Sequence, residues 1–591
     1  MGVDHARCGR SRRPSGSCPG RRVRRGRRRR AAAGRLLALT LILAGPACDV
    51  APGASDGAAG DPSDAASTSS PAARSTEPAR AAETPSPGPG PASCEPLRQT
   101  GPVVRRSVVF VLADTLRRDR LGAHGGAAAT PAFDRFAAEG IVFTRATSQA
   151  PWTKPAIASL FTGLLPSRHG VVSHPDLEAR ASAPERLESD LLDERVETLA
   201  ERLAAGGYRT AAFVSNPWLQ RSLGFAQGFD LYEDRFAANH TPGEVVTRAG
   251  LDWLRETREE SAPFFLYLHY MDPHSPFEPL TDEAIDDRHA ELVRDPRPLS
   301  DEARWKITAL ARAPDGTPVV DAELPASIAL MELLYDQGVE RFDRVLDELL
   351  EGLRRIDPER TWAVVVTSDH GEALYDRGWG EHGHALFEDE VGIPLAMWLP
   401  GVEPMGTVPC AVGLVDLLPT LCDYLGVDCP ADHDGRSMFR EEIADPTRGL
   451  RIEGAIARPE VRAVRDARWK LMAEPLGAVT APLDGVSPAL GPFALFDLET
   501  DPGEQLDLVP TLDARPAARR AFSRLRTELD RRPAGVPAGP SAPRVQLDAA
   551  SRTRLEALGY IDPSPRPDAG DGASEPSPGS VDHRTSTSGP D

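Results

Sequence analysis

The segment SVVFVLADT, residues 107–115, decides the fold that we predict for this chain. Residues 108–113 form a continuous apolar run rich in β-branched side chains, which is typical of a central strand in a parallel sheet buried on both faces. The run leads directly into Asp114. A carboxylate at the end of a buried strand is well placed to bind a hard cation, although an Asp in such a position can equally cap the following turn.

Apolar strands and amphipathic helices alternate along the chain beyond this segment. We predict further strands over residues 208–214, 264–268, 363–367 and 393–399, and helices over residues 132–139, 196–205 and 324–355. Strands that alternate with helices form a parallel sheet flanked by those helices. The sequence therefore predicts an α/β fold whose functional site lies at the carboxyl ends of the strands.

A candidate nucleophile lies in the segment SQAPWTKPAIASLFTG. Thr153 precedes Pro155, which suits the first turn of a helix that reaches Thr162 and ends at Gly163. A hydroxyl at the amino end of a helix can attack an anionic ester, because the free N–H groups and the helix dipole favour negative charge there. Lys154 would add charge stabilisation, whereas the alternative interpretation makes Thr153 a simple helix cap.

Two further polar clusters follow predicted strands. The strand that ends in VVVTS is followed by Asp369 and His370, and His382 follows shortly after within GEHGH. The motif HYMDPHSP places His274 behind another predicted strand. Asp and His together suit Zn or Mn, and Ca or Mg stays open if other carboxylates take part. Because the carboxyl ends of parallel strands meet at one edge of a sheet, we expect these clusters to converge.

These motifs, in this order, resemble the sulfatase family within the alkaline phosphatase superfamily. The resemblance rests on VVFVLADTLRRDRLGAHG, PWTKPAIASLFTGLLPSRHG, FLYLHYMDPHSPF and VVVTSDHGEALYDRGWGEHG, and on RWKLM and ALFDLETDPGEQLDL nearer the carboxyl terminus. It implies the alkaline-phosphatase-like fold, a large and mostly parallel sheet flanked by helices plus a smaller carboxyl-terminal sheet. On this basis we expect a catalytic domain over residues 105–445 and a second subdomain over residues 446–561.

The resemblance also implies roles for individual residues. Thr153 would be the nucleophile, and His274 and His382 would contact the substrate oxyanion or protonate the leaving group. One divalent metal ion, Ca, Mg, Mn or Zn, would be bound. Its ligands would be Asp114, Thr153, Asp369 and His370.

The sequence departs from the family pattern at three points. Sulfatases usually carry two adjacent Asp residues where this chain has Asp114 and Thr115. Their nucleophile is a Cys or Ser in a Cys/Ser-x-Pro-Ser-Arg motif that is oxidised to formylglycine, whereas this chain has TKPAI, residues 153–157. The Lys commonly found just after the Gly-x-His segment is also missing. We therefore expect no formylglycine.

A Thr nucleophile beside a single metal ion resembles the phosphotransferase branch of the superfamily. We expect a metal-dependent ester hydrolase acting through Thr153, with a small anionic ester or a sulfated or phosphorylated glycan or lipid as substrate. Phosphate chemistry is favoured, because a phospho-Thr intermediate is readily hydrolysed at phosphorus, whereas a sulfo-Thr intermediate has no hemiacetal route for release. Two alternatives stay open, a non-catalytic sulfatase-like binding protein and a phospho-headgroup transferase.

The amino terminus is typical of an export signal. Residues 1–35 contain 13 Arg and one Asp, and the apolar segment LLALTLILA follows. These nine residues would rise only about 14 Å as a helix, too little to cross a bilayer core of about 30 Å. We therefore predict a signal peptide over residues 1–48. Cys48 stands where a bacterial lipoprotein is acylated, so we expect a periplasmic protein, a cell-surface lipoprotein anchored through Cys48, or a secreted protein.

Composition constrains the rest of the chain. Residues 49–100 and 562–591 are rich in Ala, Ser, Pro and Gly, and we expect them to be disordered. The net charge is −20, of which +12 lies in residues 1–35, so the remainder carries −32 and nucleic acid is not an expected partner. In an exported protein a disulfide among Cys410, Cys422 and Cys429 is permitted, and the last two are closest in sequence.

Overall fold

The computed structural model describes residues 94–174, 187–238, 241–257, 261–277, 324–377, 380–456, 461–473, 492–531 and 542–557. The predicted signal peptide, the predicted carboxyl-terminal tail and all but the end of the predicted tether lie outside these residues. Within this part of the chain, no helix has both the length and the apolar character that a membrane span needs.

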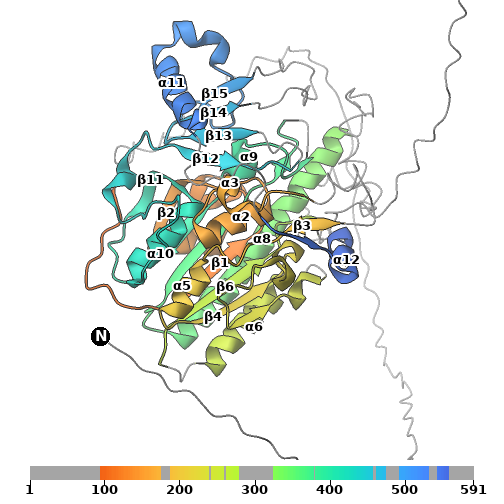
Figure 1. Cartoon of the computed structure of the whole chain (residues 1–591), viewed down its shortest axis with the longest axis vertical. Coiled ribbons are helices and arrows are strands. Elements are labelled where there is room, and N and C mark those ends of the chain that lie inside the picture. The colour runs from red at the N-terminus through yellow and green to blue at the C-terminus, as the bar shows by residue number, and fades with distance from the viewer. Residues whose placement is uncertain are drawn as a thin grey trace, which may run out of the picture. The chain divides into compact units, whose positions relative to one another are not determined.

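A large sheet of eight strands lies at the centre, in the order β11-β2-β10-β7-β1-β6-β4-β5 (Figure 1). Strand β1 pairs in parallel with β6 on one side and β7 on the other, and all its residues are buried. This position explains its continuous apolar run and confirms the predicted α/β fold. The strands are β1 (Val108–Ala113), β2 (Ile141–Thr147), β4 (Arg209–Val214), β5 (Leu231–Glu233), β6 (Phe264–Tyr270), β7 (Ala363–Ser368), β10 (Leu395–Trp398) and β11 (Gly406–Gly413).

One predicted strand runs in an unexpected direction. The strand expected over residues 393–399 is β10, and it pairs antiparallel with both β7 and β2. Parallel neighbours need a crossover connection, usually a helix of useful length. Between β7 and β10 the described chain has only the short helix α9 (Glu388–Val391), so it turns back along the same edge of the sheet.

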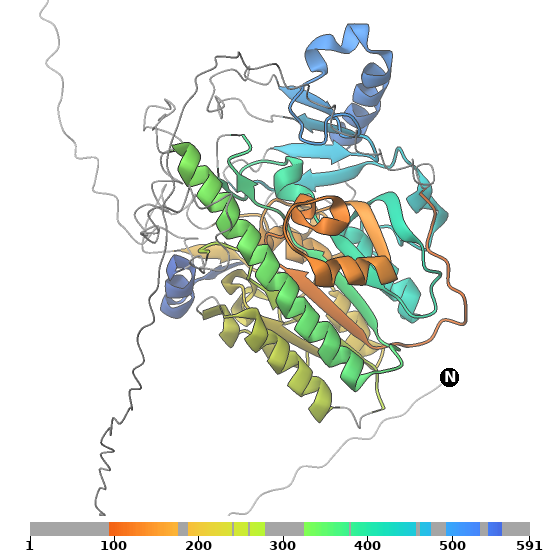
Figure 2. The same ribbon diagram turned by 180° about the vertical axis from the view of Figure 1, so that it is seen from behind.

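Helices cover both faces of the large sheet (Figures 1 and 2). One face packs against α1 (Pro131–Glu139), α6 (Gly243–Glu256) and α8 (Leu324–Ile356). The other packs against α2 (Thr153–Thr162), α5 (Leu199–Ala205) and α10 (Leu417–Leu425). Helix α5 starts three residues later than predicted, because Thr198 and Glu201 form a capping box there.

A second, antiparallel sheet has the order β12-β13-β14-β15, as the family resemblance implied. The motif RWKLM spans β14 and ALFDL falls on β15, while α11 (Pro516–Asp530) packs on one face of the sheet. The strands are β12 (Leu450–Glu453), β13 (Arg462–Arg465), β14 (Trp469–Ala473) and β15 (Phe493–Asp497).

The last described segment returns to the larger part of the structure. Strand β16 (Arg544–Gln546) pairs with β3 (Glu188–Asp190), and α12 (Ala549–Ala557) follows it. The Ser551 hydroxyl in α12 donates a 2.7 Å hydrogen bond to the side chain of Gln220. Residues 542–557 therefore contact β3 and Gln220, which follows β4.

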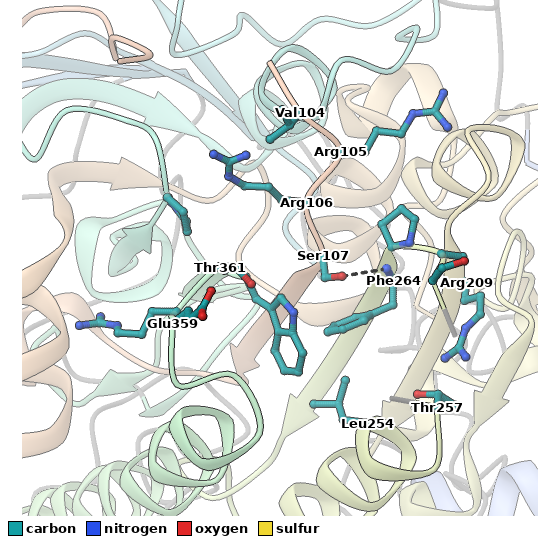
Figure 3. Close-up of a pocket in the computed structure, with 16 residues that line it drawn as sticks. Val104, Arg105, Arg106, Ser107, Arg209, Leu254, Thr257, Phe264, Glu359 and Thr361 are labelled. Carbon is teal, nitrogen blue, oxygen red and sulfur yellow. Dashed lines mark hydrogen bonds between the residues drawn. The ribbon is translucent and has the colours of Figure 1, made fainter. Parts of the chain in front are cut away.

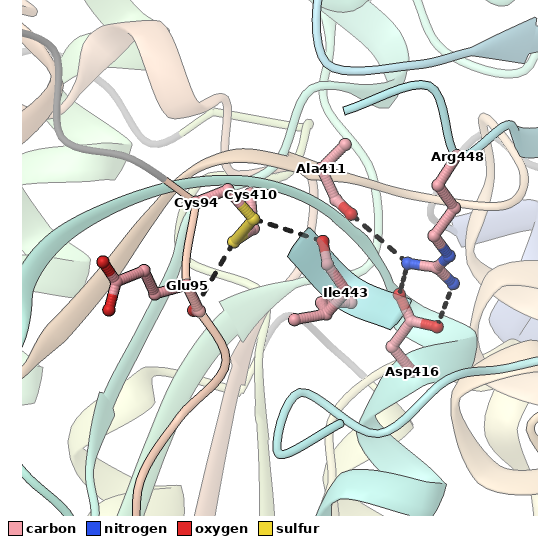
Figure 4. Close-up of a disulfide and its surroundings, with 7 residues drawn as sticks. All are labelled: Cys94, Glu95, Cys410, Ala411, Asp416, Ile443 and Arg448. Carbon is pink, nitrogen blue, oxygen red and sulfur yellow. Dashed lines mark hydrogen bonds and ion pairs between the residues drawn. A yellow bond between two sulfur atoms is a disulfide. The ribbon is translucent and has the colours of Figure 1, made fainter. Parts of the chain in front are cut away.

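A disulfide links two cysteines that are far apart in sequence. It joins Cys94 to Cys410 in β11, with the Cα atoms 4.8 Å apart (Figure 4). Cys422 and Cys429, the closest pair in sequence, have free thiols. The segment before β1 is also held by backbone hydrogen bonds, from Leu97 N–H to the Met438 carbonyl and from Glu403 N–H to the Arg98 carbonyl, and sequence spacing gives no sign of these contacts.

A buried cluster of charges connects the two sheets through Glu388 in α9. Its carboxylate oxygens lie 2.9 Å from Arg118, 2.9 Å from Arg465 and 3.2 Å from Lys470. The Glu388 N–H donates a 2.7 Å hydrogen bond to Glu504, which also pairs with Lys470 at 3.0 Å. Arg118 follows β1, whereas Arg465 and Lys470 belong to the second sheet, so Glu388 holds both sheets together.

We expect Glu388→Gln to lower the free energy of unfolding by about 3 to 5 kcal/mol near neutral pH, because it leaves buried cations without their partner. Burial would raise the pKa of Glu388, but the surrounding cations outweigh it and hold that pKa well below its usual range. The stabilisation is therefore present above the unfolded-state pKa of about 4.5 and is lost as the pH falls further.

Urea denaturation at neutral and acid pH measures both effects. The matched control is Glu499→Gln, whose exposed pair with Arg468 at 2.8 Å should contribute less than about 1 kcal/mol. Equal stability of the Glu388 variant and the parent protein at neutral pH would contradict the role of this cluster.

Candidate active site

Four neighbouring parallel strands present polar side chains at the same edge of the large sheet. Asp114 directly follows β1, Asp369 directly follows β7, and His269 lies near the end of β6. Asn216 follows β4 by two residues. The carboxyl ends of these strands lie side by side, so the predicted convergence of polar clusters is found in the structure.

All four predicted metal ligands meet at this edge. The Nε2 atom of His370 lies 3.5 Å from Asp114 Oδ1 and 3.4 Å from Asp369 Oδ2. The Thr153 hydroxyl lies 3.3 Å from His370 Nε2 and 3.5 Å from Asp114 Oδ2. All four side chains are buried. The arrangement puts a hydroxyl against the Asp114 carboxylate and the His370 imidazole, and that imidazole also contacts the Asp369 carboxylate.

Two further residues belong to this cluster, and we did not predict a role for either. His269 Nε2 lies 3.5 Å from Asp114 Oδ2. Asn216 Nδ2 donates hydrogen bonds to Asp114 Oδ2 at 2.7 Å and to Thr153 Oγ1 at 3.2 Å. Like Asp114, each is a polar residue at the end of a buried strand, and this sequence pattern could have identified both.

The cluster fits one divalent cation. Asp114, His269 and Asp369 each offer a ligand atom, and these atoms lie within 4.8 Å of one another. Several buried polar atoms of this cluster have no hydrogen-bond partner among the described residues. They are Asp114 Oδ1, Asp369 Oδ2 and both ring nitrogens of His269. Oxygen and nitrogen donors of this kind suit Ca, Mg, Mn or Zn, and they do not distinguish among them.

Electrostatics also favour a cation at this position. Burial raises the pKa of Asp114 to about 7, against the opposing effects of His382 and Asn216. Burial, together with the charge of Asp114, raises the pKa of Asp369 well above its usual range. Burial lowers the pKa of His269 to about 3, which leaves a neutral imidazole able to bind metal. Two buried carboxylates this close need a positive charge to remain ionised.

Thr115 occupies the position where the family usually has a second Asp. Its φ of 57° lies in the left-handed region, which is rare for a β-branched residue. Its N–H donates to Asp369 Oδ1 at 3.3 Å, and its carbonyl accepts a 2.7 Å hydrogen bond from the Tyr335 hydroxyl. Thr115 therefore orients Asp369 through its backbone.

The segment around Thr153 folds as predicted. Thr153 is the first residue of α2, and Gly163 ends the helix with a φ of 67°. The buried ammonium group of Lys154 donates to the Ser189 hydroxyl and lies 5.7 Å from the centre of the Trp218 ring. Burial lowers its pKa to about 7. Its observed contacts are thus with a neighbouring strand and ring, and its catalytic role stays a prediction.

Three histidine rings form a row at the cluster. The centre of the His382 ring lies 4.5 Å from that of His370 and 5.1 Å from that of His274. His382 Nδ1 lies 3.1 Å from Glu372 Oε2. Burial alone would lower the pKa of His382, but the charge and hydrogen bond of Glu372 outweigh it and raise that pKa to about 9. Both predicted acid–base histidines therefore stand beside the candidate metal ligands.

Comparison with known proteins identifies relatives of this arrangement. An endo-4-O-sulfatase of Bacteroides thetaiotaomicron is 24% identical over 476 residues, 70% of this chain and 87% of the relative. The structure of a protein in complex with its substrate D-glucosamine-2-N,6-O-disulfate superposes with a TM-score of 0.54 at 17% identity, covering 72% of this chain and 97% of that one. A Bacteroides fragilis structure assigned as a sulfatase gives a TM-score of 0.52 at 20% identity, covering 72% and 96%.

The solved structures agree with the fold, a large, mostly parallel sheet with a separate small antiparallel sheet. The family model described as Sulfatase matches residues 106–427, which is more than half of the chain. That match spans β1, the Thr153 helix and both histidine motifs, all of which contribute to the cluster. The chain therefore belongs to the sulfatase family of hydrolases.

Proposed function

We propose that this protein is a metal-dependent hydrolase of anionic esters that uses the Thr153 hydroxyl as its nucleophile. The observation that carries the proposal is the position of that hydroxyl. It stands at the amino end of α2, 3.5 Å from Asp114 Oδ2 and 3.3 Å from His370 Nε2. A nucleophile in contact with candidate metal ligands is the arrangement that metal-assisted ester cleavage requires.

Asp114, Asp369 and His370 would hold the metal ion together with Thr153, and His269 adds a fifth possible donor. The ion supplies positive charge that lowers the pKa of a neighbouring hydroxyl and screens the charge developing on the substrate. Asn216 donates a hydrogen bond to Thr153 Oγ1, which favours the deprotonated oxygen. This oxygen would attack the phosphorus or sulfur atom, and the bond to the leaving oxygen would break.

His382 and His274 would handle the proton of the leaving group. The Glu372 carboxylate raises the pKa of His382 to about 9, which suits a general acid that must carry a proton before the bond breaks. His274 is buried with its ring beside His382. One of the two would then act as base for the water that releases the Thr153 ester.

We favour phosphate esters as the substrate class, because a phosphorylated Thr can be released by attack of water at phosphorus. Sulfate esters are the second candidate, and the endo-4-O-sulfatase of Bacteroides thetaiotaomicron supports them. A sulfated or phosphorylated glycan or lipid would serve in either case. Formylglycine is not part of the proposal, since residue 153 is Thr.

We also propose that the protein is exported. The Cys94–Cys410 disulfide supports this, since such bonds persist in oxidising compartments. Cys48, the predicted attachment point of a lipid anchor, lies outside the described residues. The lipid anchor therefore rests on the sequence alone.

The first prediction concerns the nucleophile. Thr153→Ala should reduce kcat/KM by at least about 10³-fold, as removal of a nucleophile does in other hydrolases. Turnover of 4-nitrophenyl sulfate, 4-nitrophenyl phosphate and bis(4-nitrophenyl) phosphate measures the loss and selects the ester class. The control is Thr162→Ala at the other end of α2. Its hydroxyl, among the described residues, donates to the Ala158 carbonyl and accepts from the Leu164 N–H, both within the local chain.

Full activity of Thr153→Ala would refute the assigned nucleophile. Turnover of the sulfate ester alone would refute the preference for phosphate. If no ester is cleaved by a metal-loaded parent protein, a non-catalytic binding protein becomes the better account.

The second prediction concerns the metal site. Asp369→Asn should lower the metal content from one ion per chain to well below one, because it removes the charge of a buried ligand. Elemental analysis after dialysis against each candidate ion gives the stoichiometry. Asp343→Asn is the matched control, a buried carboxylate that accepts hydrogen bonds from the first turn of α1. Equal metal content in both variants would place the ion elsewhere.

The third prediction separates the general acid from the other histidines. His382→Gln should slow cleavage of alkyl esters by about 10²- to 10⁴-fold, since poor leaving groups need a proton. Cleavage of 4-nitrophenyl esters should fall much less, because 4-nitrophenolate leaves without one. His433→Gln, distant in sequence and bonded through Nδ1 to the Gly435 carbonyl, is the control. An equal loss for both ester types would remove His382 from this role.

A further inference from the structure

We propose that this protein has a second, non-catalytic binding site, at the amino edge of the large sheet, for oligosaccharides that carry several sulfate or phosphate groups. The site is a cavity of about 560 Å³ (Figure 3). Its lining includes Ser107, Arg209, Phe264 and Trp362, which stand at the amino ends of β1, β4, β6 and β7. The candidate metal ligands follow the carboxyl ends of these strands, so the two sites lie at opposite edges of the sheet.

The described part of the cavity lining is positive, in a chain whose net charge is −20. Among the described lining residues are four arginines, Arg105, Arg106, Arg209 and Arg360, and one carboxylate, Glu359. Arg360 also pairs with Glu139 at 2.6 Å, so the other three arginines carry the positive charge of the described lining. Guanidinium groups bind sulfate and phosphate oxygens through paired N–H donors, and a lysine offers no such planar fork. The lining therefore selects oxyanions rather than neutral or cationic ligands.

Three of these arginines are held in place by aromatic rings. The guanidinium carbon of Arg106 lies 6.0 Å from the ring centre of Tyr424, and that of Arg209 lies 4.9 Å from the ring centre of Trp253. For Arg360 the corresponding distance is 3.7 Å, to Trp398. Stacking restricts the rotamers of a long side chain, so less conformational entropy is lost when an anion binds.

The arrangement of the arginines favours a ligand with separated charges. Figure 3 shows Arg105, Arg106 and Arg209 around the cavity with their side chains pointing in different directions. A single compact anion would reach few of them, whereas an oligosaccharide with several anionic groups could reach them all. Phe264 and Trp362, whose ring centres are 4.8 Å apart, give the cavity an aromatic wall against which a sugar ring can pack.

This proposal does not depend on the chemistry at Thr153. Binding at the amino edge would retain an anionic polymer on the protein and lower KM for polymeric esters, with no part in bond cleavage. Turnover of a small 4-nitrophenyl ester would be unaffected. The two substrate sizes therefore separate a binding defect at this cavity from a failure of the proposed hydrolase.

The test uses the full chain carrying Thr153→Ala, with titration calorimetry against a chondroitin sulfate octasaccharide and a phosphorylated mannan oligosaccharide. We expect two binding sites per chain for at least one of these. Adding Arg105→Ala and Arg106→Ala should weaken one site by at least about tenfold, because both residues supply charge-assisted contacts. Arg105 is exposed and Arg106 is half-buried, so the variant should fold.

The matched control replaces two arginines of α11, Arg519→Ala and Arg526→Ala, which removes the same charge from the second sheet domain. Equal loss in both double variants would show a nonspecific charge effect and overturn the proposal. So would unchanged binding in the Arg105/Arg106 variant, or equal affinity for desulfated chondroitin. Binding to phosphatidylserine vesicles with no binding to either oligosaccharide would assign the arginines to a membrane surface instead.

Discussion

The close approach of two buried carboxylates is the constraint on which this structure depends. Strands β1 and β7 are adjacent and parallel, with Ala113 opposite Ser368, so the next residues, Asp114 and Asp369, necessarily leave the sheet side by side. No solvent reaches either side chain. Such a pair is stable only with a neighbouring positive charge or with a proton on one oxygen. The hydroxyl, amide and imidazole groups around it are arranged for the first of these solutions.

The polar residues at the carboxyl edge of the large sheet were predicted well from the sequence, because buried apolar runs and family motifs meet at that edge. Continuous apolar runs mark β1, β6 and β7, and their ends mark Asp114 and Asp369. Periodicity carries no strand direction, however, so the antiparallel course of β10 could not be foreseen. The Cys94–Cys410 bond depends on contacts between segments distant in sequence, and a lone cysteine does not reveal its partner.

The second sheet contributes to the site through charge rather than through a ligand. Lys470 of the RWKLM motif and Glu504 of the DPGE turn both contact Glu388. In the same helix, the buried Glu390 carboxylate accepts hydrogen bonds from the N–H groups of residues 384 and 385, directly after the loop that carries His382. The carboxyl-terminal motifs therefore support the segment between β7 and β10, which also carries His382.

The groups that can attract an anion lie at the two opposite edges of the large sheet, and this separation bears on the size of the substrate. The chain as a whole repels anions, so attraction must come from local groups, which would be the candidate metal site at one edge of the sheet and the arginines at the other. β1 spans six residues, or about 20 Å at the usual rise per residue. A simple phosphate or sulfate ester cannot bridge that distance. Only an extended anionic polymer could occupy both edges at once, and this is the ligand class that the two proposed sites would accept together.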